Sequence, residues 1–303
     1  MKIYEYRIIV PIEYAHYIVG NRFMALEYVK SETANGEGIE VVKSEQFDGT
    51  NSGKTDIRGE KGTHTEKIYH IKSKIPGFIR WAVPDKYLHF YETSYNCFPH
   101  FLTMYDVPGM GKDFDLRIES QHVKYEHGMK DFPSNATKLN SSELKKRKIV
   151  WLDIINGIPK KSEFSLKGYK CEKADLDFTR PEFKEGSSSE QSSSSNAPDN
   201  IYEDNEEVPE DDSSSNKPPE WTTKYKGEMT CAIKVVKFHF KWLGLQTAVE
   251  KLITHSVYPK MFTDSHRRMI RCMDQWYGLT MEDIYRIESE VFADQKQNTK
   301  FES

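Results

Sequence analysis

Strand-like segments recur along most of this 303-residue chain, and this pattern limits its possible folds more than any other feature. In these segments apolar and polar side chains alternate, or β-branched and aromatic residues gather, as is typical of strands in a partly buried sheet. The segments are residues 2–10, 39–47, 64–73, 87–95, 98–105, 114–125, 149–155 and 230–242. The turn residues near 35–38 and the polar loop 48–62 indicate that the second and third segments are neighbouring antiparallel strands.

Helical patterns stand near both ends of the chain. Apolar residues recur at helical spacing from Tyr14 to Tyr28, and residues 246–276 form an amphipathic segment that we expect to bend or restart at Pro259. The tetrapeptide at 280–283, Thr-Met-Glu-Asp, resembles a capping box that opens a last helix. We therefore predict an α+β fold in which long helices back one antiparallel sheet.

An acidic, serine-rich tract occupies residues 185–220. It holds ten serines, eleven acidic residues and one base, Lys217. Such a segment cannot bury enough apolar surface to offset its ordering entropy, so we predict a disordered insertion. Because the whole chain carries a formal net charge of −4, the remainder is mildly basic. A basic body suits an anionic surface such as phospholipid headgroups, although a solvated mixed-charge surface gives the same balance.

Composition excludes several classes of protein. No stretch approaches the roughly 18 apolar residues that a membrane-spanning helix needs, and the first residues include acidic Glu5 and Glu13 and no small-residue cleavage site. We therefore expect neither a spanning nor a secreted protein. The four cysteines, Cys97, Cys171, Cys231 and Cys272, lack any paired spacing, which argues against disulfides and a structural zinc site and favours a reducing, cytoplasmic setting.

Several polar residues lie on faces that are otherwise apolar. In 230–242 the even positions form an apolar face interrupted by Lys234, and the even positions of 114–120 end in Ser120. Because a lone buried ammonium is costly, Lys234 requires an anion. Any one such residue can instead be paired locally or reach water at a strand end.

The same kind of interruption occurs on another strand and on both helices. Thr65 and Lys67 share a strand face with apolar neighbours, Glu288 falls inside the buried stripe of the last helix, and Asn21 interrupts that of the first. Together these groups fit a cavity that binds an amphipathic ligand with an anionic, hydroxyl-rich head.

Two short segments are more apolar than their position explains. Residues 76–84 lie between strands and are bracketed by prolines, and we expect a loop or short helix that carries Phe78, Ile79 and Trp81. Trp242-Leu243 ends a strand just before a helix. Both segments are consistent with ordinary packing under a loop or with an apolar tip that enters a bilayer surface.

Six stretches of the chain, in order, resemble the phosphatidylinositol transfer proteins, and within them the single-domain members of class I. The stretches are EYRIIVP at 5–11, GEGIEVV at 36–42, GEKGTHTEKIYHIKSKIP at 59–76, YNCFP at 95–99, CAIKVVKFHFKWLGLQ at 231–246 and LTMEDIYRIE at 279–288. The resemblance implies a START-like, helix-grip fold in which a concave antiparallel sheet and long helices enclose a single-phospholipid cavity. It also implies one domain over 1–295, interrupted by the tract 185–220 and followed by a tail at 296–303.

The resemblance also assigns site residues. The positions that contact inositol in the family fall on Thr65, Lys67, Asn96 and Glu288, and those that contact phosphate fall on Asn21, Thr103, Ser120 and Lys234. Asn21 and Ser120 depart from the family's Gln and Thr but keep hydrogen-bonding groups. The membrane-docking residues are Phe78, Ile79, Trp81, Trp242 and Leu243, with Leu243 in place of a second tryptophan. Phe101 replaces a cysteine found in many members, and residues 73–87 correspond to the lipid-exchange loop.

The expected function is therefore exchange of one phosphatidylinositol or phosphatidylcholine molecule between membranes, by a monomer in transient contact with the membrane surface. The resemblance implies neither catalysis nor a cofactor, metal or nucleic acid, and it allows functional coupling to phosphoinositide kinases.

Three alternatives remain open. Residues 49–55, Gly-Thr-Asn-Ser-Gly-Lys-Thr, superficially suggest a nucleotide-binding loop, but they are one residue short and lie between strands. The acidic tract could make the chain a lipid-dependent signalling scaffold. The fold could also carry phosphatidic acid, a sphingolipid or another lipid.

Overall fold

The computed structural model describes residues 1–32, 38–51, 57, 59–70, 76–84, 87–129, 132, 136–157, 162–184 and 217–298. Most of the acidic tract, most of the C-terminal tail and two parts of the predicted lipid-exchange loop lie outside these residues, so the predictions made for them stay predictions.

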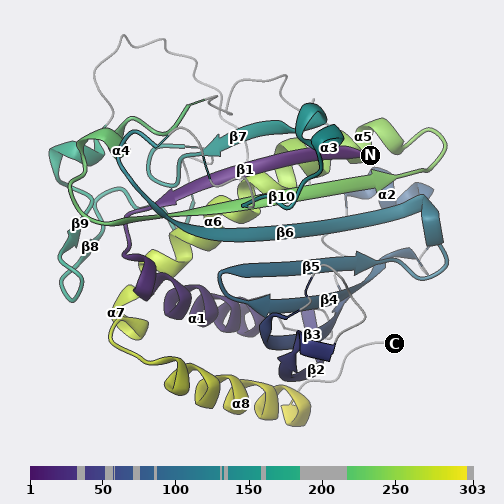
Figure 1. The fold of residues 1–303 in the computed structure, drawn as a ribbon. Coiled ribbons are helices and arrows are strands. Elements are labelled where there is room, and N and C mark those ends of the chain that lie inside the picture. Colours follow the sequence, from purple (N-terminus) through teal and green to yellow (C-terminus); the bar gives the residue numbers. More distant parts are fainter. Residues whose placement is uncertain are drawn as a thin grey trace.

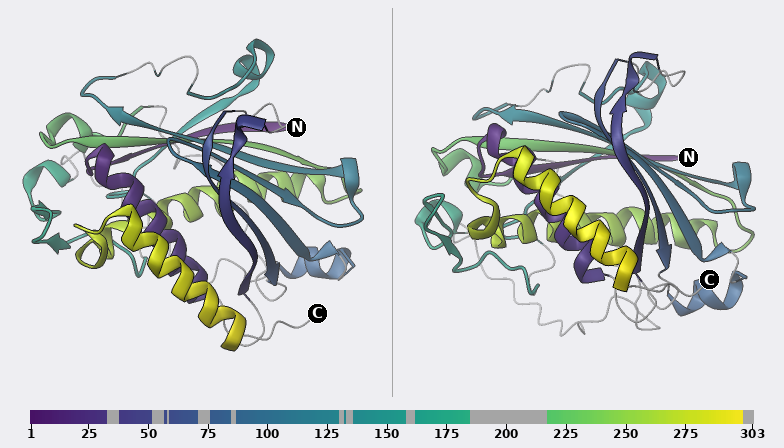
Figure 2. Two further views of the ribbon diagram at one scale, coloured as in Figure 1. Left: turned by 60° about the horizontal axis from the view of Figure 1, so that its bottom comes forward. Right: turned by 90° about the horizontal axis from the view of Figure 1, so that it is seen from below.

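An eight-stranded sheet forms the centre of the described molecule, in the order β2-β3-β4-β5-β6-β10-β1-β7 (Figure 1). Its strands are β1 Lys2–Val10, β2 Gly38–Asp48, β3 Lys61–His70, β4 His89–Cys97, β5 His100–Asp106, β6 Phe114–Tyr125, β7 Lys148–Leu152 and β10 Met229–Phe240. The sheet is open, and its strands turn progressively from β1 to β2 (Figure 2). The prediction of an α+β fold is confirmed.

One pairing departs from the predicted antiparallel arrangement, because β7 runs parallel to β1. The strand β10 is antiparallel to both β6 and β1, so β6, β1 and β7 share one direction. Parallel strands require a crossover rather than a hairpin. The chain reaches β7 from β6, which has the same direction but is not its neighbour in the sheet. This connection contains α3, Ser141–Lys146, which starts with a capping box between Asn140 and Glu143.

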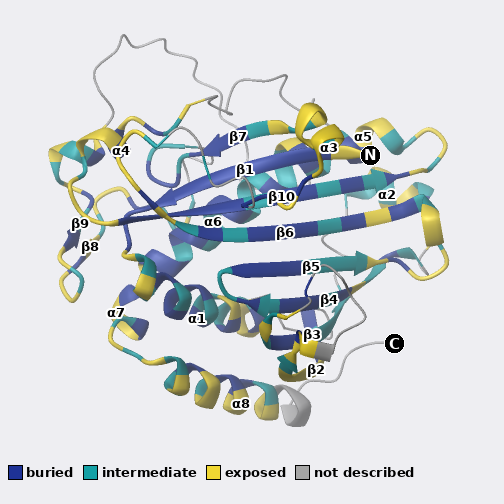
Figure 3. Ribbon diagram, in the orientation of Figure 1, coloured by how far each residue is buried: buried dark blue, intermediate teal, exposed yellow. Residues whose placement is uncertain are grey.

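Burial along the strands follows their place in the sheet. Every residue of β1 after Lys2 is buried, because β1 lies between two strands and both its faces are covered. The edge strand β2 is mostly exposed from Val42 onward and has a register shift between Val41 and Lys43. Exposed charges and a bulge are common on edge strands, where they oppose pairing with another chain. Figure 3 shows this contrast across the sheet.

Three long helical segments complete the main architecture. The first helix, α1, spans Tyr14–Glu32, and the last, α8, spans Met281–Asn298. Thr280 caps α8 as predicted, since its amide donates to Asp283 Oδ2 (3.0 Å) and the Asp283 amide donates to Thr280 Oγ1 (3.2 Å).

The segment that we expected to bend or restart at Pro259 stays helical, and its winding changes just before that proline. α5, Gln246–Leu252, leads into a π-helical turn, Ile253–Val257, before α6, Tyr258–Arg271. Pro259 stands in the first turn of α6, where its missing N–H costs least. The remaining short elements are α2 Gly77–Ala82, α4 Trp221–Lys224, α7 Met273–Trp276, β8 Lys170–Cys171, β9 Leu176–Asp177 and the 3₁₀ turns Gly49–Asn51, Gly111–Asp113 and Pro181–Phe183.

The long helices gather on one face of the sheet, which we call the helix-covered face (Figure 2). Tyr6 of β1 donates to the carbonyl of Thr254, and α1 and α8 lie side by side. The opposite, outer face packs against α3 and the residues before it, where Leu139 contacts Ile3 and Val235. The space between the sheet and the helices is therefore where ligand-binding side chains would meet.

Candidate functional site

The strand register brings six predicted site residues onto the helix-covered face. In the first row Thr65, Ser94 and Thr103 are direct neighbours across β3, β4 and β5. In the second row Asn96, Phe101, Ser120 and Lys234 are neighbours across β4, β5, β6 and β10. In the third row Lys67 lies opposite Glu92, and Glu92 opposite Tyr105. Directly opposed residues, and residues two apart on one strand, share a face of the sheet.

The two predicted helical residues reach the same region. Glu288 of α8 is 7% exposed, pairs with Arg22 of α1 at 2.7 Å and accepts from Ser44 Oγ at 3.4 Å. Ser44 lies opposite Thr65 in the sheet. Asn21 of α1 is buried, and its amide donates to the hydroxyl of Tyr17 at 3.3 Å. All eight predicted headgroup residues thus lie on or beside one face.

A carboxylate that the sequence did not single out organises the third row. Glu92 accepts from Lys67 Nζ at 3.0 Å, from the Tyr69 hydroxyl at 2.5 Å and from Ser94 Oγ at 3.0 Å. Tyr105 is its direct neighbour on β5. We call Lys67, Tyr69, Glu92, Ser94 and Tyr105 the glutamate cluster. The even positions of β4 include Glu92, Ser94 and Asn96, so this face is polar in sequence and Glu92 does not interrupt an apolar stripe as Lys234 does.

Arg22 was also missed by sequence reasoning. Its guanidinium joins Glu288 to Thr63 Oγ1, which lies 3.4 Å from the same Nη2 atom. Thr63 is opposite Asn96 in the sheet. The ion pair therefore fixes α8 and α1 against the strands that carry Thr65 and Asn96.

A second cluster lies around Lys234. The ammonium is 3.4 Å from Ser120 Oγ and stands over the Phe262 ring of α6, 5.2 Å from its centroid. Among the residues that the structure describes, no carboxylate forms an ion pair with it. Burial lowers the pKa of Lys234 to about 8. Lys234 is therefore a desolvated cation to which the described residues supply no carboxylate.

Two histidines and a tyrosine complete this lysine cluster, which consists of Tyr17, Ser120, His122, Lys234 and His266. Tyr17 Oη lies 2.9 Å from His266 Nε2, and its ring is 5.0 Å from that of His122. Burial, followed by the Lys234 charge, lowers the pKa of His266 to about 3 and that of His122 well below its usual value. Both imidazoles are therefore neutral at pH 7.

His122 has one ring nitrogen without a partner. The side chain is 1% exposed, and Nδ1 lies 2.9 Å from the Pro99 carbonyl, to which it donates. Nε2 then carries a lone pair, and it has no hydrogen-bond partner among the described residues. Phe98 and Phe101 pack against the ring. Phe101 thus forms an apolar wall beside His122.

The predicted membrane-docking residues form one patch from two distant segments. Trp81 is 90% exposed and Leu243 fully exposed, and Phe78 is also exposed. Ile79 and Trp242 are partly covered and pack beneath them around Val83 and Leu88. Figure 1 shows α2 near the junction of β10 and α5.

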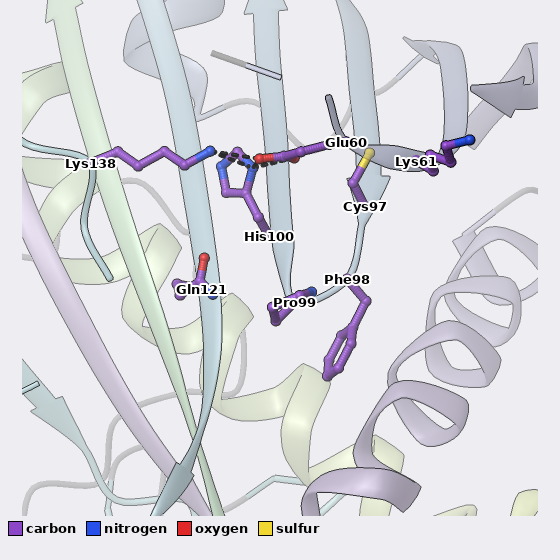
Figure 4. Close-up of a pocket in the computed structure, with 8 residues that line it drawn as sticks. All are labelled: Glu60, Lys61, Cys97, Phe98, Pro99, His100, Gln121 and Lys138. Carbon is purple, nitrogen blue, oxygen red and sulfur yellow. Dashed lines mark hydrogen bonds and ion pairs between the residues drawn. The ribbon is translucent and has the colours of Figure 1, made fainter. Parts of the chain in front are cut away.

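A cavity of about 420 Å³ lies by the β4–β5 turn (Figure 4). Cys97, His100 and Gln121 line it, and they alternate along their strands with Asn96, Phe101 and Ser120, so they face the outer side. Glu60 contacts both His100 and Lys138, at 2.7 and 2.8 Å. Glu60 thus pairs with both basic side chains and holds the segment around Lys138 to the sheet. Because these charged groups already have partners and face away from the helices, we do not assign the ligand to this cavity.

The structure also bears on the nucleotide-loop alternative and on metal sites and membrane-spanning helices. Residues 49–51 form a single 3₁₀ turn between β2 and β3 instead of opening a long helix, which weakens the nucleotide-loop alternative. Within the described residues, no group of three or more His, Cys, Asp or Glu side chains is arranged to hold a metal. No described helix is long and apolar enough to cross a bilayer.

Polar rows facing helices, an interior lysine without a carboxylate partner among the described residues and an exposed apolar patch together define a class of protein that binds anionic amphipathic molecules. The chain belongs to the phosphatidylinositol transfer protein family, whose profile matches residues 1–293. The resemblance seen in the sequence is thereby confirmed, and the chain is a phospholipid transfer protein.

Individual relatives agree with this assignment. The human phosphatidylinositol transfer protein beta isoform is 32% identical over 291 residues, covering 95% of this chain and 90% of the relative. Phosphatidylinositol transfer protein 2 of Dictyostelium discoideum is 30% identical over 299 residues, covering 97% of this chain and 95% of the relative. The Drosophila melanogaster protein retinal degeneration B is 29% identical over 292 residues, but these make up 21% of that longer protein.

Proposed function

We propose that the chain holds one phosphatidylinositol or phosphatidylcholine molecule between the sheet and the helices and exchanges it between membranes. The observation that carries this proposal is Lys234, an interior cation with no carboxylate partner among the described residues. Desolvating an ammonium without an anion is costly, and a lipid phosphate would supply the missing charge.

The phosphate would be bound by Lys234 with Ser120, Thr103 and Asn21. Lys234 and Ser120 face each other across β10 and β6, and Thr103 lies in the adjoining row. Asn21 is tied through Tyr17 to His266, next to the lysine. Both proposed cargoes carry a phosphate diester, so this set would contribute affinity to each.

The inositol ring would be bound by Thr65, Lys67, Asn96 and Glu288. Lys67, Asn96, Thr103 and Lys234 are only partly covered although they face the helices, which is consistent with a space for a headgroup. Hydroxyl, ammonium, amide and carboxylate groups suit a ring of hydroxyls, because each hydroxyl can both donate and accept a hydrogen bond. A lipid without these hydroxyls leaves such groups unpaired, which is the physical basis of selectivity.

The patch of Phe78, Ile79, Trp81, Trp242 and Leu243 would dock on the bilayer. Moving its exposed apolar side chains out of water would lower the free energy of the system, and an aromatic ring such as Trp81 suits the membrane interface. Opening of the segment 73–87, which carries Phe78, Ile79 and Trp81 of this patch, would then let acyl chains pass between bilayer and protein.

We further propose that the chain acts as a monomer without catalysis, as one domain over 1–295 with the insertion 185–220 and the tail 296–303. It would be cytoplasmic and bind membranes transiently. Coupling to phosphoinositide kinases would follow from delivery of their substrate.

The headgroup assignment is tested by the lipid that co-purifies with the protein. Wild type should carry phosphatidylinositol and phosphatidylcholine in mass spectrometry, and Thr65→Ala should lose the first and keep the second. Thr230→Ala is a matched control, because this buried hydroxyl donates to the Ile12 carbonyl and has no part in the proposed site. If wild type carries only a lipid without inositol, such as phosphatidic acid, the inositol assignment is wrong.

The docking patch is tested separately with vesicles. Trp81→Ala combined with Leu243→Ala should reduce vesicle binding and transfer while bound lipid composition stays unchanged. Leu144→Ala is the control, because Leu144 is an exposed leucine on α3 at the outer face. Equal losses in both proteins would remove the reason for choosing this patch.

A further inference from the structure

Glu92 is a buried carboxylate whose hydrogen bonds are all made within the chain. It is 5% exposed and faces the helices from β4. Its oxygens accept from Lys67, Tyr69 and Ser94, and Tyr105 lies directly opposite it on β5. Two carboxylate oxygens offer about four acceptor sites. Protein donors therefore occupy most of the acceptor capacity of Glu92, which makes it poorly suited to bind a ligand hydroxyl itself.

The carboxylate is charged at neutral pH. Burial alone raises the pKa of Glu92, but the Lys67 ammonium and the tyrosine and lysine hydrogen bonds outweigh burial and lower it below the usual value. A charged acceptor fixes the direction of every hydrogen bond that reaches it, because it can donate none.

The charged Glu92 also fixes which group donates in the next hydrogen bonds, through Ser94 to Thr65. Ser94 donates its only proton to Glu92 Oε1. The 2.8 Å contact between Ser94 and Thr65 must then use the Thr65 proton. The Thr65 oxygen is left with lone pairs to offer, so it is an acceptor toward any ligand beside it.

Lys67 is fixed in the complementary role. Its ammonium has three N–H donors, and the contact with Glu92 uses one of them. Thr65 and Lys67 lie two residues apart on the same face of β3. The site therefore presents an acceptor beside a donor, a pattern that a hydroxyl group satisfies at both positions and that a quaternary ammonium satisfies at neither.

We infer that Glu92 is the positioning residue that sets the preference of this site for a hydroxyl-bearing headgroup. It orients Thr65 as an acceptor through Ser94, it holds Lys67 as a donor, and it neutralises Lys67 when the bound lipid has no hydroxyls. The inference rests on the proposed function, because it concerns how that site distinguishes its two cargoes.

Glu92→Gln tests this role with little change in size. The amide offers one acceptor oxygen and introduces N–H donors, which oppose the donors of Lys67, Tyr69 and Ser94. Ser94 can then reverse, and Thr65 loses its fixed acceptor role. We expect the ratio of bound phosphatidylinositol to phosphatidylcholine to fall about tenfold, with phosphatidylcholine affinity changed by no more than about twofold.

The controls separate positioning from folding. Glu119→Gln changes another buried carboxylate, which faces the outer side of β6 and pairs with Arg117 at 2.9 Å. It should leave the lipid ratio at the wild-type value. Glu92→Asp keeps the charge and should restore part of the preference that Glu92→Gln loses.

Mass spectrometry of bound lipid after loading from mixed vesicles gives the ratio directly. A wild-type ratio in Glu92→Gln overturns the inference, and so does an equal loss of both lipids, which indicates a purely structural role. If wild type itself shows no phosphatidylinositol, the proposed function fails instead, so the two failures are distinguishable.

Discussion

The glutamate cluster and the lysine cluster lie on the same face of one sheet, yet their charges are matched in different ways. Lys67 has Glu92 at 3.0 Å, and Glu288 nearby has Arg22 at 2.7 Å. Lys234 has only a 3.4 Å contact with a serine hydroxyl and the face of an aromatic ring. One region is electrostatically complete within the described chain, and the other is not.

This difference suggests a division of labour between the two regions. A region whose charges are paired keeps its geometry with any cargo, so it can select among headgroups without collapsing when one lacks hydroxyls. A region with an unpaired interior cation is stabilised by an anion that every cargo supplies. Affinity would then depend mainly on the lysine cluster and selectivity mainly on the glutamate cluster.

The largest expected effect comes from Lys234→Met. Removing a charged partner of the phosphate should weaken both lipids about 100-fold, while the empty protein stays folded because a desolvated charge is lost. Lipid occupancy measured by native mass spectrometry checks this. Lys237→Met is the control, since Lys237 points to the outer face and pairs with Glu143. Selective loss of one lipid in Lys234→Met would contradict the division.

The next effect is a pH dependence of binding. In the empty protein Lys234 loses its proton around pH 8, whereas a bound phosphate keeps it charged. Affinity should therefore be nearly constant up to about pH 7, fall about twofold by pH 8 and about tenfold by pH 9, since each unit above the pKa costs a factor of ten.

Other groups near Lys234 do not titrate in this range. Burial lowers the pKa of His122 and His266 far below it, and burial raises the pKa of Tyr6 and Tyr17 above it. Lipid uptake measured by fluorescence between pH 7 and 9 should show the fall in wild type. The same dependence in Lys234→Met would assign it to another group.

Sequence reasoning found the lysine cluster more completely than the glutamate cluster, and the strand patterns explain why. Lys234 interrupts an otherwise apolar alternation on β10, whereas β4 has polar residues on both faces, so Glu92 does not stand out locally. Arg22 is part of the site because it pairs with Glu288, which is 266 residues away in the sequence. Such pairings depend on the tertiary arrangement and leave no local signal.

The same limit applies to the fold. The bounds of β1 and β6 were predicted as residues 2–10 and 114–125, as observed, because periodicity records which side chains are buried. Periodicity does not record strand direction, so the parallel pairing of β7 with β1 was not foreseen. The π-helical turn before Pro259 was likewise not foreseen, because the sequence indicated only a bend or a restart there.

A smaller effect is expected from Glu288→Gln. The change removes the charge that accepts from Arg22 and from the proposed inositol hydroxyls, so the ratio of phosphatidylinositol to phosphatidylcholine should fall about fivefold, with a modest loss of thermal stability. Glu290→Gln is the control on an exposed position of the same helix. An equal decrease in both lipids would show that the pair with Arg22 serves the fold and not selection.

The smallest and sharpest test uses two buried serines. Ser120 touches Lys234, and Ser94 links Glu92 to Thr65. Each Ser→Ala change removes one hydroxyl of the same size from the same face of the sheet, and each should cost about threefold in binding. Ser120→Ala should weaken both lipids equally and leave their ratio unchanged. Ser94→Ala should weaken phosphatidylinositol alone, because only that lipid uses the orientation of Thr65. If both variants changed the ratio by the same factor, the two clusters would act as one site, and the difference in their charge pairing would have no bearing on selectivity.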